Sequence, residues 1–329
     1  MMTPRENMMA IYQGQQPDYY GDFMPALQFV PDPVFLRDRI PQDGNLHQDA
    51  WGTYYCFPPG TPGAHPMVNG DNAVIQDIEH WREQLHVPSL LDLDWEAAAA
   101  QAKAVDRNQF FCAVFSSGGL FERSHHLMGM ETALINYLEY PEEMADLLAV
   151  IADYKIEYLK LCARYIQPDI VFFHDDWGTK QNVFLPPRVW RELIKPLHQK
   201  IVQTAHDCGI LFMHHADCVC QPLVTDMVEI GIDIWQGVIP QNDIVEIQRI
   251  TQGKLALIGG IDGPKIDVEQ ITEEEIRAEV RRAFDTYCPA GRFYPSIANG
   301  CCFRPWNNAI YLDELASYGR SYARSHPIL

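Results

Sequence analysis

The chain has 329 residues, 47% of them hydrophobic, which is enough for one large α/β barrel or two ordinary domains. Its formal net charge of −19 disfavours nucleic acid and anionic membranes as partners. No segment approaches the roughly 20 apolar residues that a membrane helix needs, and the N-terminal segment lacks the apolar core of a signal peptide. We therefore expect a cytoplasmic protein whose nine cysteines are mostly reduced and buried.

Helical and strand patterns alternate after about 75 N-terminal residues that are rich in Pro, Gly, Asp and aromatics and are expected to be irregular. A helix is expected to begin at Pro141, because proline suits the first helical position and the two glutamates that follow face the positive end of the helix dipole. Another is expected to begin near Pro186 and to be interrupted at Pro196. Short β-branched and aromatic runs predict strands at 110–115, 169–173, 209–213, 232–235, 255–258 and 293–297.

The order of these elements predicts the fold class. Strands that alternate with helices favour a parallel sheet, and polar residues gather at the ends of the strands, where α/β barrels hold their active sites. A nucleotide-binding doubly wound sheet is disfavoured because neither GxGxxG nor GxxxxGK[ST] follows any strand. We therefore expect one α/β barrel with its chemistry at the strand ends.

The end of the strand at 209–213 offers candidate metal ligands. Side chains alternate along a strand, so His215 and Asp217 are expected to share one face. Cys301, which follows the last strand, is the best candidate for a third ligand, and the fold would have to bring it close. An imidazole, a carboxylate and a thiolate with an open fourth position would suit catalytic zinc. His214 or Cys218 could replace one of these ligands, and all three could instead serve packing or capping.

A second polar cluster, His174-Asp175-Asp176, follows the strand at 169–173. Paired carboxylates at a strand end can hold a proton, a cation or a substrate hydroxyl, so these three residues are the catalytic candidates. The alternative is that one carboxylate caps a turn and the other is solvated. His125 could reach the same pocket or lie in a surface loop, and Trp51 could line the pocket or belong to the core.

Several short motifs, each weak alone, occur in an order that resembles the uroporphyrinogen decarboxylase superfamily. They lie between about residues 47 and 310 and are Asp49-Ala50-Trp51-Gly52, Asp175-Asp176-Trp177-Gly178-Thr179, Pro186-Pro187-Arg188-Val189-Trp190, Lys195-Pro196, Gly231-Ile232-Asp233 and Gly259-Gly260-Ile261-Asp262. The resemblance implies a single (β/α)8 TIM-type barrel domain over residues 1–329, with the irregular segment 1–75 packing on the barrel.

The decarboxylases of that superfamily remove acetate carboxylates from uroporphyrinogen without a cofactor. They carry an arginine-containing motif, Met-Arg-Gln-Ala-Gly-Arg, that grips the carboxylates of the substrate. The corresponding region here, Phe23 to Ile40, has only Arg37 and Arg39 in an unrelated context. Because the substrate carries eight carboxylates and the chain is itself strongly acidic, this departure counts against uroporphyrinogen as the substrate.

A second branch of the superfamily, zinc-dependent methyltransferases that exchange methyl groups with corrinoid proteins, is closer in site pattern. Its motif, His-x-Cys after one strand and Gly-Cys near the C-terminus, corresponds here to His215-Ala216-Asp217 and Gly300-Cys301. The resemblance implies zinc held by His215, Asp217 and Cys301, with a carboxylate in place of one thiolate. A carboxylate donates less charge and leaves zinc more Lewis acidic, which favours an O-methyl donor, an ether or a methanol-like molecule, over a thiol.

The leading hypothesis is therefore zinc-dependent transfer of a methyl group from a small-molecule donor to a corrinoid. A separate protein must carry the corrinoid, because the chain lacks an Asp-x-His-x-x-Gly motif. His174, Asp175 or Asp176 would protonate the leaving oxygen. Three residues are expected to contact the substrate: Trp51, His125 and Trp177. The alternatives are a cofactor-free decarboxylase centred on Asp175 or Asp176, and a barrel that only binds a ligand; a homodimer is left open.

Overall fold

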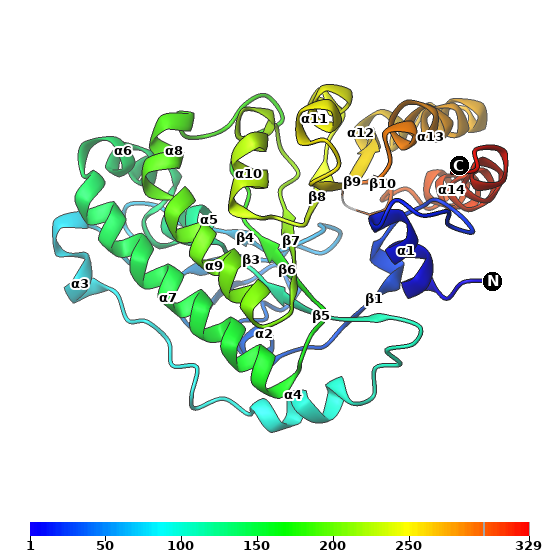
Figure 1. Ribbon diagram of the computed structural model, residues 1–329. Coiled ribbons are helices and arrows are strands. Elements are labelled where there is room, and N and C mark those ends of the chain that lie inside the picture. Colours follow the sequence, from blue (N-terminus) through cyan, green and yellow to red (C-terminus); the bar gives the residue numbers. More distant parts are fainter. Residues whose placement is uncertain (299, 329) are drawn as a thin grey trace.

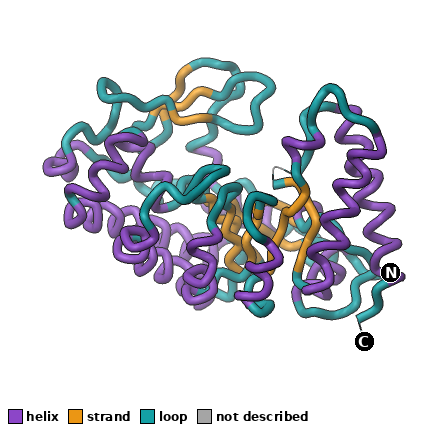
Figure 2. Tube along the Cα trace, turned by 90° about the horizontal axis from the view of Figure 1, so that it is seen from above, coloured by secondary structure: helices purple, strands orange, loops and turns teal. Residues whose placement is uncertain are grey.

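The computed structural model describes residues 1–298 and 300–328. Within them a parallel sheet of seven strands curls into a partial barrel, and the longer helices pack on its outer side (Figures 1 and 2). In spatial order the strands are β1 (Leu27–Phe29), β5 (Phe111–Ser116), β6 (Ile170–His174), β7 (Leu211–His215), β8 (Ile234–Val238), β9 (Ala256–Ile261) and β10 (Phe293–Ile297). Apart from β1, every strand of this sheet was expected from the sequence to within three residues at each end.

The helices begin and end where local signals favour it. The helix expected at Pro141 is α7, which runs for 25 residues. The predicted interruption lies at Ile194, two residues before Pro196, where α8 ends and α9 begins. The α-helices are α1 (Pro4–Tyr12), α2 (Pro33–Arg37), α3 (Trp81–Gln84), α4 (Trp95–Ala102), α5 (Leu120–Met128), α6 (Met130–Glu139), α7 (Pro141–Tyr165), α8 (Pro187–Leu193), α9 (Lys195–Asp207), α10 (Val224–Ile230), α11 (Ile244–Thr251), α12 (Gly263–Ile266), α13 (Glu273–Tyr287) and α14 (Pro305–Ser325).

The curled parallel sheet is consistent with the expected TIM-type barrel, but within the described residues it has seven strands where eight were expected. Among the described residues, no backbone ladder joins β1 to β10. Side chains fill the interval instead, since the ring of Phe23 stacks on Phe111 of β5 at 5.3 Å and meets Tyr294 of β10 edge-on at 5.0 Å. Proline cannot donate to a ladder, so Pro25 beside the interval and Pro295 in β10 both suit a sheet edge.

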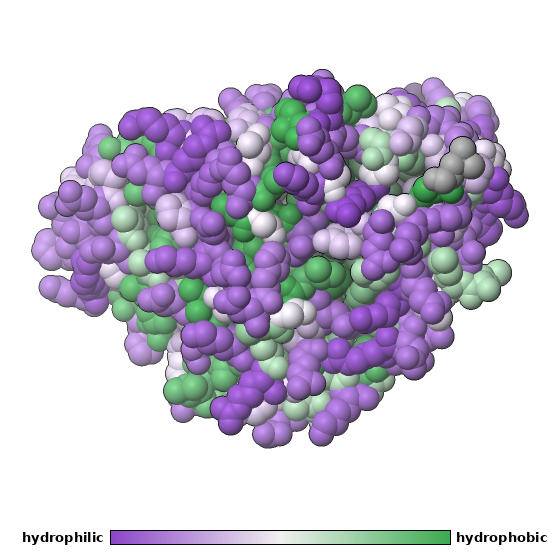
Figure 3. Space-filling view, viewed as in Figure 1, coloured by the Kyte–Doolittle hydropathy of each residue, from purple (hydrophilic) through white to green (hydrophobic). Residues whose placement is uncertain are grey.

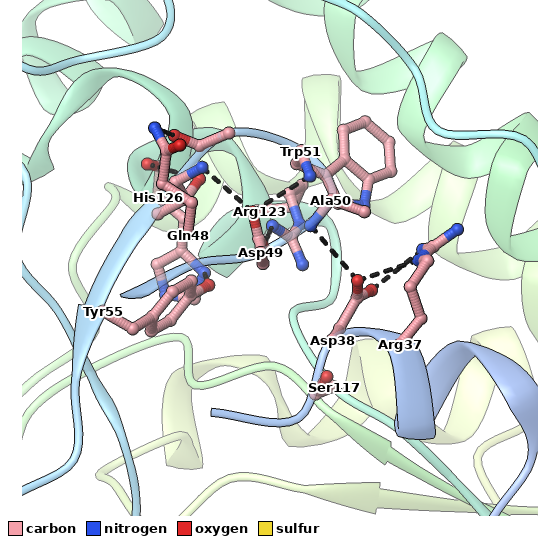
Figure 4. A network of polar contacts seen from close by, with 12 residues as sticks. Arg37, Asp38, Gln48, Asp49, Ala50, Trp51, Tyr55, Ser117, Arg123 and His126 are labelled. Atoms are coloured by element: carbon pink, nitrogen blue, oxygen red, sulfur yellow. Dashed lines mark hydrogen bonds and ion pairs between the residues drawn. The ribbon is translucent and has the colours of Figure 1, made fainter. Parts of the chain in front are cut away.

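The first 75 residues, for which an irregular segment was expected, contain more regular structure than their composition indicates. They supply α1, α2 and β1, and a small antiparallel sheet of β2 (Leu46–Gln48), β3 (Tyr54–Cys56) and β4 (His65–Pro66) that stands apart from the central sheet in Figure 2. Buried polar contacts hold this segment against α5, including the ion pair of Asp49 with Arg123 (Figure 4). The segment therefore covers the end of the barrel near α5.

The core lies between the sheet and its helices, where the strands β5 to β10 are almost entirely buried, whereas β1 is largely exposed. In the part of the chain that the structure describes, no helix combines the length and apolar character needed to cross a membrane. Hydrophilic residues predominate on the face shown in Figure 3, with apolar residues in scattered patches between them. This surface agrees with the high net charge of the sequence.

Candidate metal centre at the ends of β6 and β7

A row of polar side chains crosses the sheet where β6 and β7 end. His174 of β6 pairs in register with His215 of β7, which in turn pairs with Gln236 of β8. The two imidazole rings are stacked, with 4.4 Å between their centroids. Asp176 lies two residues after the end of β6, and one potential ligand atom from each of His174, Asp176 and His215 lies within 4.8 Å of the other two. Parallel strand register therefore assembles a group of three metal-ligating side chains.

Each of these three side chains is oriented by a hydrogen bond to a residue outside the group. Nδ1 of His174 lies 2.9 Å from Oε2 of Glu122, a carboxylate oxygen that can only accept. Nδ1 of His215 faces Oε1 of Gln236, whose Nε2 donates to the carbonyl of Ala298. These acceptors place a proton on each Nδ1 and make each Nε2 the nitrogen that would bind a metal once it is deprotonated, as in known metal sites where the distal nitrogen is held by a carboxylate or carbonyl.

The carboxylate of Asp176 is oriented in the same way, because its Oδ1 accepts the backbone N–H of Asp217 at 2.9 Å. Its other oxygen remains available. Two imidazoles and one carboxylate form a donor set that suits a divalent transition metal with an open coordination position. The residues present therefore fit a metal ion.

The surroundings carry negative charge. Burial alone would raise the pKa of Glu122, but the neighbouring His174 outweighs it and lowers that pKa to about 2. Burial would lower the pKa of His174, yet the charge and hydrogen bond of Glu122 raise it to about 9. Burial and the charge of Glu122 raise the pKa of Asp176 to about 7. A cation between these groups would relieve repulsion among the carboxylates.

Asp175, an expected catalytic residue, faces α5 instead of the ligand group. Its carboxylate accepts the backbone N–H groups of Phe121 at 3.3 Å and Glu122 at 2.9 Å, and also Nε1–H of Trp177 at 2.9 Å. A Cβ at Gly119 would lie 2.3 Å from that of Asp175, so only glycine allows this approach. Asp175 thus joins β6 to the first turn of α5 and positions Glu122 behind His174.

Two of the expected metal ligands lie outside the group. β7 ends at His215, so the alternation that would have aligned Asp217 with it does not continue. The carboxylate of Asp217 instead pairs with Nζ of Lys180 at 3.0 Å. Cys301 is exposed in the segment after β10 and is not in the group. The alternative ligand Cys218 is buried with its Sγ 3.3 Å from that of Cys220.

Of the three residues expected to contact substrate, two are buried and one is partly exposed. Trp51 is buried against Tyr154, with a ring separation of 4.8 Å, and Trp177 is buried against Trp190 at 4.7 Å. Both indoles therefore lie in the packed interior, and Trp177 also donates its Nε1–H to Asp175. His125 on α5 is partly exposed, and burial lowers its pKa to about 4.

Sequence reasoning missed the two residues that orient the imidazoles. The sequence could have indicated Gln236, which had a recognisable signal. It is the polar residue in the otherwise apolar strand Ile234–Val238, where a buried amide needs hydrogen-bond partners. Glu122 had a weaker one, as an acidic residue in the first turn of a helix that follows a strand. A single carboxylate in that position is common and would not by itself indicate a metal site.

Behind β6 and β7, an aromatic cluster encloses polar atoms without partners. The ring nitrogens of His198 and His214 and Nε1 of Trp190 are buried and make no hydrogen bond within the described residues. His198 packs edge-to-face against Phe173 and against His214, each with 5.2 Å between ring centroids. Burial lowers the pKa of His198 to about 3, so this ring is neutral in the folded protein.

We expect this burial to make the protein less stable in mild acid. Below about pH 6.5 the unfolded chain protonates His198 and the folded chain does not, so stability falls by about 1.4 kcal/mol per pH unit from that group until about pH 3. His198→Phe should remove this contribution, and urea unfolding at pH 7 and pH 5 measures it. His86→Phe, at an exposed position, is the control. Equal losses from pH 7 to pH 5 in His198→Phe and the wild type would contradict the expectation.

The fold is similar to that of known structures. The structure is similar to that of a methyltransferase from Methanosarcina mazei, with a TM-score of 0.62 and 11% identity over 97% of this chain and 99% of that one. A B12-independent methionine synthase from Shewanella sp. W3-18-1 aligns with a TM-score of 0.48 and 14% identity over 70% of this chain and 66% of that one. At 11% identity the similarity to the methyltransferase concerns the fold alone. The TM-score of the methionine synthase is too low to support a conclusion about this chain.

Sequence comparison is more specific. No curated protein sequence matches this chain significantly. The family described as uroporphyrinogen decarboxylase (URO-D) matches residues 63–303, a range that includes β5 to β10 and the whole candidate metal centre. This agrees with the motifs recognised in the sequence. The chain belongs to the uroporphyrinogen decarboxylase family.

Proposed function

We propose that this protein is a zinc-dependent methyltransferase that moves a methyl group from an O-methyl donor, an ether or a methanol-like molecule, to a corrinoid carried by a partner protein. The observation that carries the proposal is the group of His174, Asp176 and His215, each held by an outer hydrogen bond and each with a ligand atom within 4.8 Å of the other two. Structural zinc sites are closed by four protein ligands, whereas three ligands leave a position for substrate.

The donor set decides which methyl donors fit. We assign His174 and Asp176 as ligands beside His215, in place of Asp217 and Cys301, so the proposed ligands are nitrogen and oxygen without sulfur. A zinc ion held in this way supplies Lewis acidity toward the oxygen that loses its methyl group. Glu122 and Gln236 hold the two rings in place, and Asp175 holds Glu122. This arrangement supports an O-methyl donor over a thiol.

The same charges count against the alternative, decarboxylation of a polycarboxylate. Glu122 and Asp176 at the candidate centre are acidic, His174 is paired with Glu122, and the cations Arg123 and Lys155 are engaged elsewhere. Arg123 is buried in its ion pair with Asp49, and Lys155 is buried with its Nζ directed to Ser116 and Ser117. Burial lowers the pKa of Lys155 to about 7. A substrate with many carboxylates would therefore meet repulsion at this site.

Metal content tests the proposal most directly. We expect purified protein equilibrated with Zn²⁺ to retain about one zinc per chain, because three oriented ligands converge on one point. His174→Ala should lose the zinc, while Cys301→Ala should keep it, since Cys301 is exposed outside the group. Elemental analysis after gel filtration measures this. A wild type without zinc, or loss of zinc in Cys301→Ala alone, would contradict the proposed ligand set.

Methyl transfer itself is a separate measurement. Zinc-loaded protein should convert cob(I)alamin to methylcobalamin in the presence of an O-methyl donor, which the absorption spectrum of the corrinoid reports. The His174→Ala variant is the matched control. If the protein binds zinc but transfers no methyl group from ethers or methanol, the proposed reaction is wrong. The protein would then be a metalloenzyme of this family that catalyses a different reaction.

A further inference from the structure

Two buried thiols lie close together in the segment that follows β7. The Sγ atoms of Cys218 and Cys220 are 3.3 Å apart, and the two residues are 2% and 0% exposed. A disulfide bond is about 2 Å long, so the sulfur atoms need to approach by little more than about 1 Å. The residues that alternate with them, Asp217, Val219 and Gln221, are partly exposed. The thiols therefore lie just beneath the surface, where an oxidant can reach them when the segment opens.

Hydrogen bonds hold the two cysteines in a fixed turn. The side chain of Asn242 accepts the backbone N–H of Cys220 and donates to the carbonyl of Cys218, each at 3.1 Å. The backbone N–H of Val219, between the cysteines, donates to the carbonyl of Thr179 at 2.8 Å. Because the fold has already restricted these residues, little further ordering is needed to join the two sulfur atoms.

The same segment holds one of the proposed metal ligands. The backbone N–H of Asp217, the residue before Cys218, donates to Oδ1 of Asp176 at 2.9 Å. A disulfide would close a tight ring across Val219 and draw the backbone of Cys218 toward Cys220. Because a rigid peptide joins Cys218 to Asp217, this movement would pull the N–H away from Asp176. The state of the thiols is therefore coupled to the position of a metal ligand.

We propose that Cys218 and Cys220 form a reversible oxidation site, and that their disulfide weakens metal binding by releasing Asp176. This inference rests on the metal binding in the proposed function. The oxidant is a peroxide such as hydrogen peroxide. One thiol sulfur attacks a peroxide oxygen, which gives a sulfenic acid and one water, and the second thiol then displaces the sulfenic oxygen as another water. Two thiols are oxidised to one disulfide, and one peroxide O–O bond is reduced.

Burial keeps the pair reduced while the segment is closed. It raises the pKa of the Cys220 thiol well above its ordinary value, and the hydrogen bond with Cys218 and the charge of Asp176 raise it further. A neutral thiol is a poor nucleophile, so oxidation requires the segment to open. With a metal bound, Asp176 and the segment that donates to it are held closed. The disulfide is therefore expected to form mainly in metal-free protein.

Peptide mapping and zinc affinity test the two parts of the proposal on the full-length protein. After treatment of metal-free protein with equimolar hydrogen peroxide, alkylation of the remaining thiols should leave Cys218 and Cys220 joined and unmodified. Competition with a chromophoric chelator should then show zinc bound roughly tenfold to a hundredfold more weakly, as when other outer contacts of a ligand are lost. A phosphine reductant should restore the affinity.

Matched variants identify the thiols that are responsible. Cys220→Ala should bind zinc as the wild type does and keep that affinity after peroxide treatment. Cys301→Ala, which removes an exposed thiol, should lose affinity on oxidation as the wild type does. Hydrogen exchange of the Asp217 amide should be faster in the oxidised wild type, because its bond to Asp176 is lost.

The outcomes separate this inference from the proposed function. A peptide map without the disulfide would overturn it, and so would a disulfide that leaves zinc affinity and the exchange of the Asp217 amide unchanged. Loss of zinc from both Cys218→Ala and Cys220→Ala in the reduced state would mean that these thiols bind the metal themselves, which would also overturn it. Reduced wild type that binds no zinc would contradict the proposed function, whereas the disulfide and the exchange of the Asp217 amide would still decide whether oxidation releases Asp176.

Discussion

Replacing Asp49 by alanine is expected to lower the free energy of unfolding by about 3–5 kcal/mol, because it leaves the guanidinium of Arg123 buried without a counter-ion. The side chains of Asp49 and Arg123 are 3% and 6% exposed. Figure 4 shows the pair where the N-terminal segment meets α5, with Trp51 beside it. Asp49 also accepts the backbone N–H groups of Trp51 at 3.0 Å and Thr53 at 2.9 Å.

Two further variants distinguish the charge from the hydrogen bonds. Asp49→Asn keeps an oxygen acceptor for the backbone and should cost less than Asp49→Ala. The double variant Asp49→Leu with Arg123→Met should recover much of the loss, because well-packed apolar groups can replace a buried ion pair. Urea denaturation measures all three. A loss below about 1 kcal/mol in Asp49→Ala would show that water or another group compensates Arg123.

The sequence predicts the sheet well because its strands carry strong local signals. Buried parallel strands are apolar runs, and those at 170–174, 211–215 and 293–297 are bounded by turns and polar residues. The small antiparallel sheet near Tyr55 was not expected, since its strands have only two or three residues each and little alternation. The interval between β1 and β10 was not foreseen either, because it depends on how Phe23 packs against two distant strands.

At the candidate site, the sequence singled out the residues that the structure brings together but grouped them differently. His174, Asp176 and His215 were all singled out, yet His215 was joined to Asp217 and Cys301 on the assumption that β7 continues past His215. Register between neighbouring strands, which pairs His174 with His215, is a property of the whole sheet. The role of Asp175 as an acceptor for α5 was equally hidden, because its partners lie more than 50 residues away.

The second large effect is expected from changing Glu122, which forms a hydrogen bond with His174. Glu122→Gln should weaken zinc binding roughly tenfold to a hundredfold, as for other residues that hold a metal-binding histidine from behind. Glutamine has the same shape and can still accept from Nδ1, but it lacks the charge that raises the pKa of His174 to about 9. The backbone N–H that binds Asp175 is unchanged, so the fold should remain intact. Competition with a chromophoric chelator measures zinc affinity.

The ionisation of His174 distinguishes this role of Glu122 from a purely structural one. In metal-free protein, Glu122→Gln should lower the pKa of His174, because burial lowers that pKa once the carboxylate is gone. NMR titration of the imidazole measures this shift. Glu131→Gln, the same change at an exposed position on α6, should alter neither the pKa nor zinc affinity. If Glu122→Gln lowers the pKa of His174 but leaves zinc affinity unchanged, then His174 is not a zinc ligand, and Asp176 and His215 must bind zinc with another group.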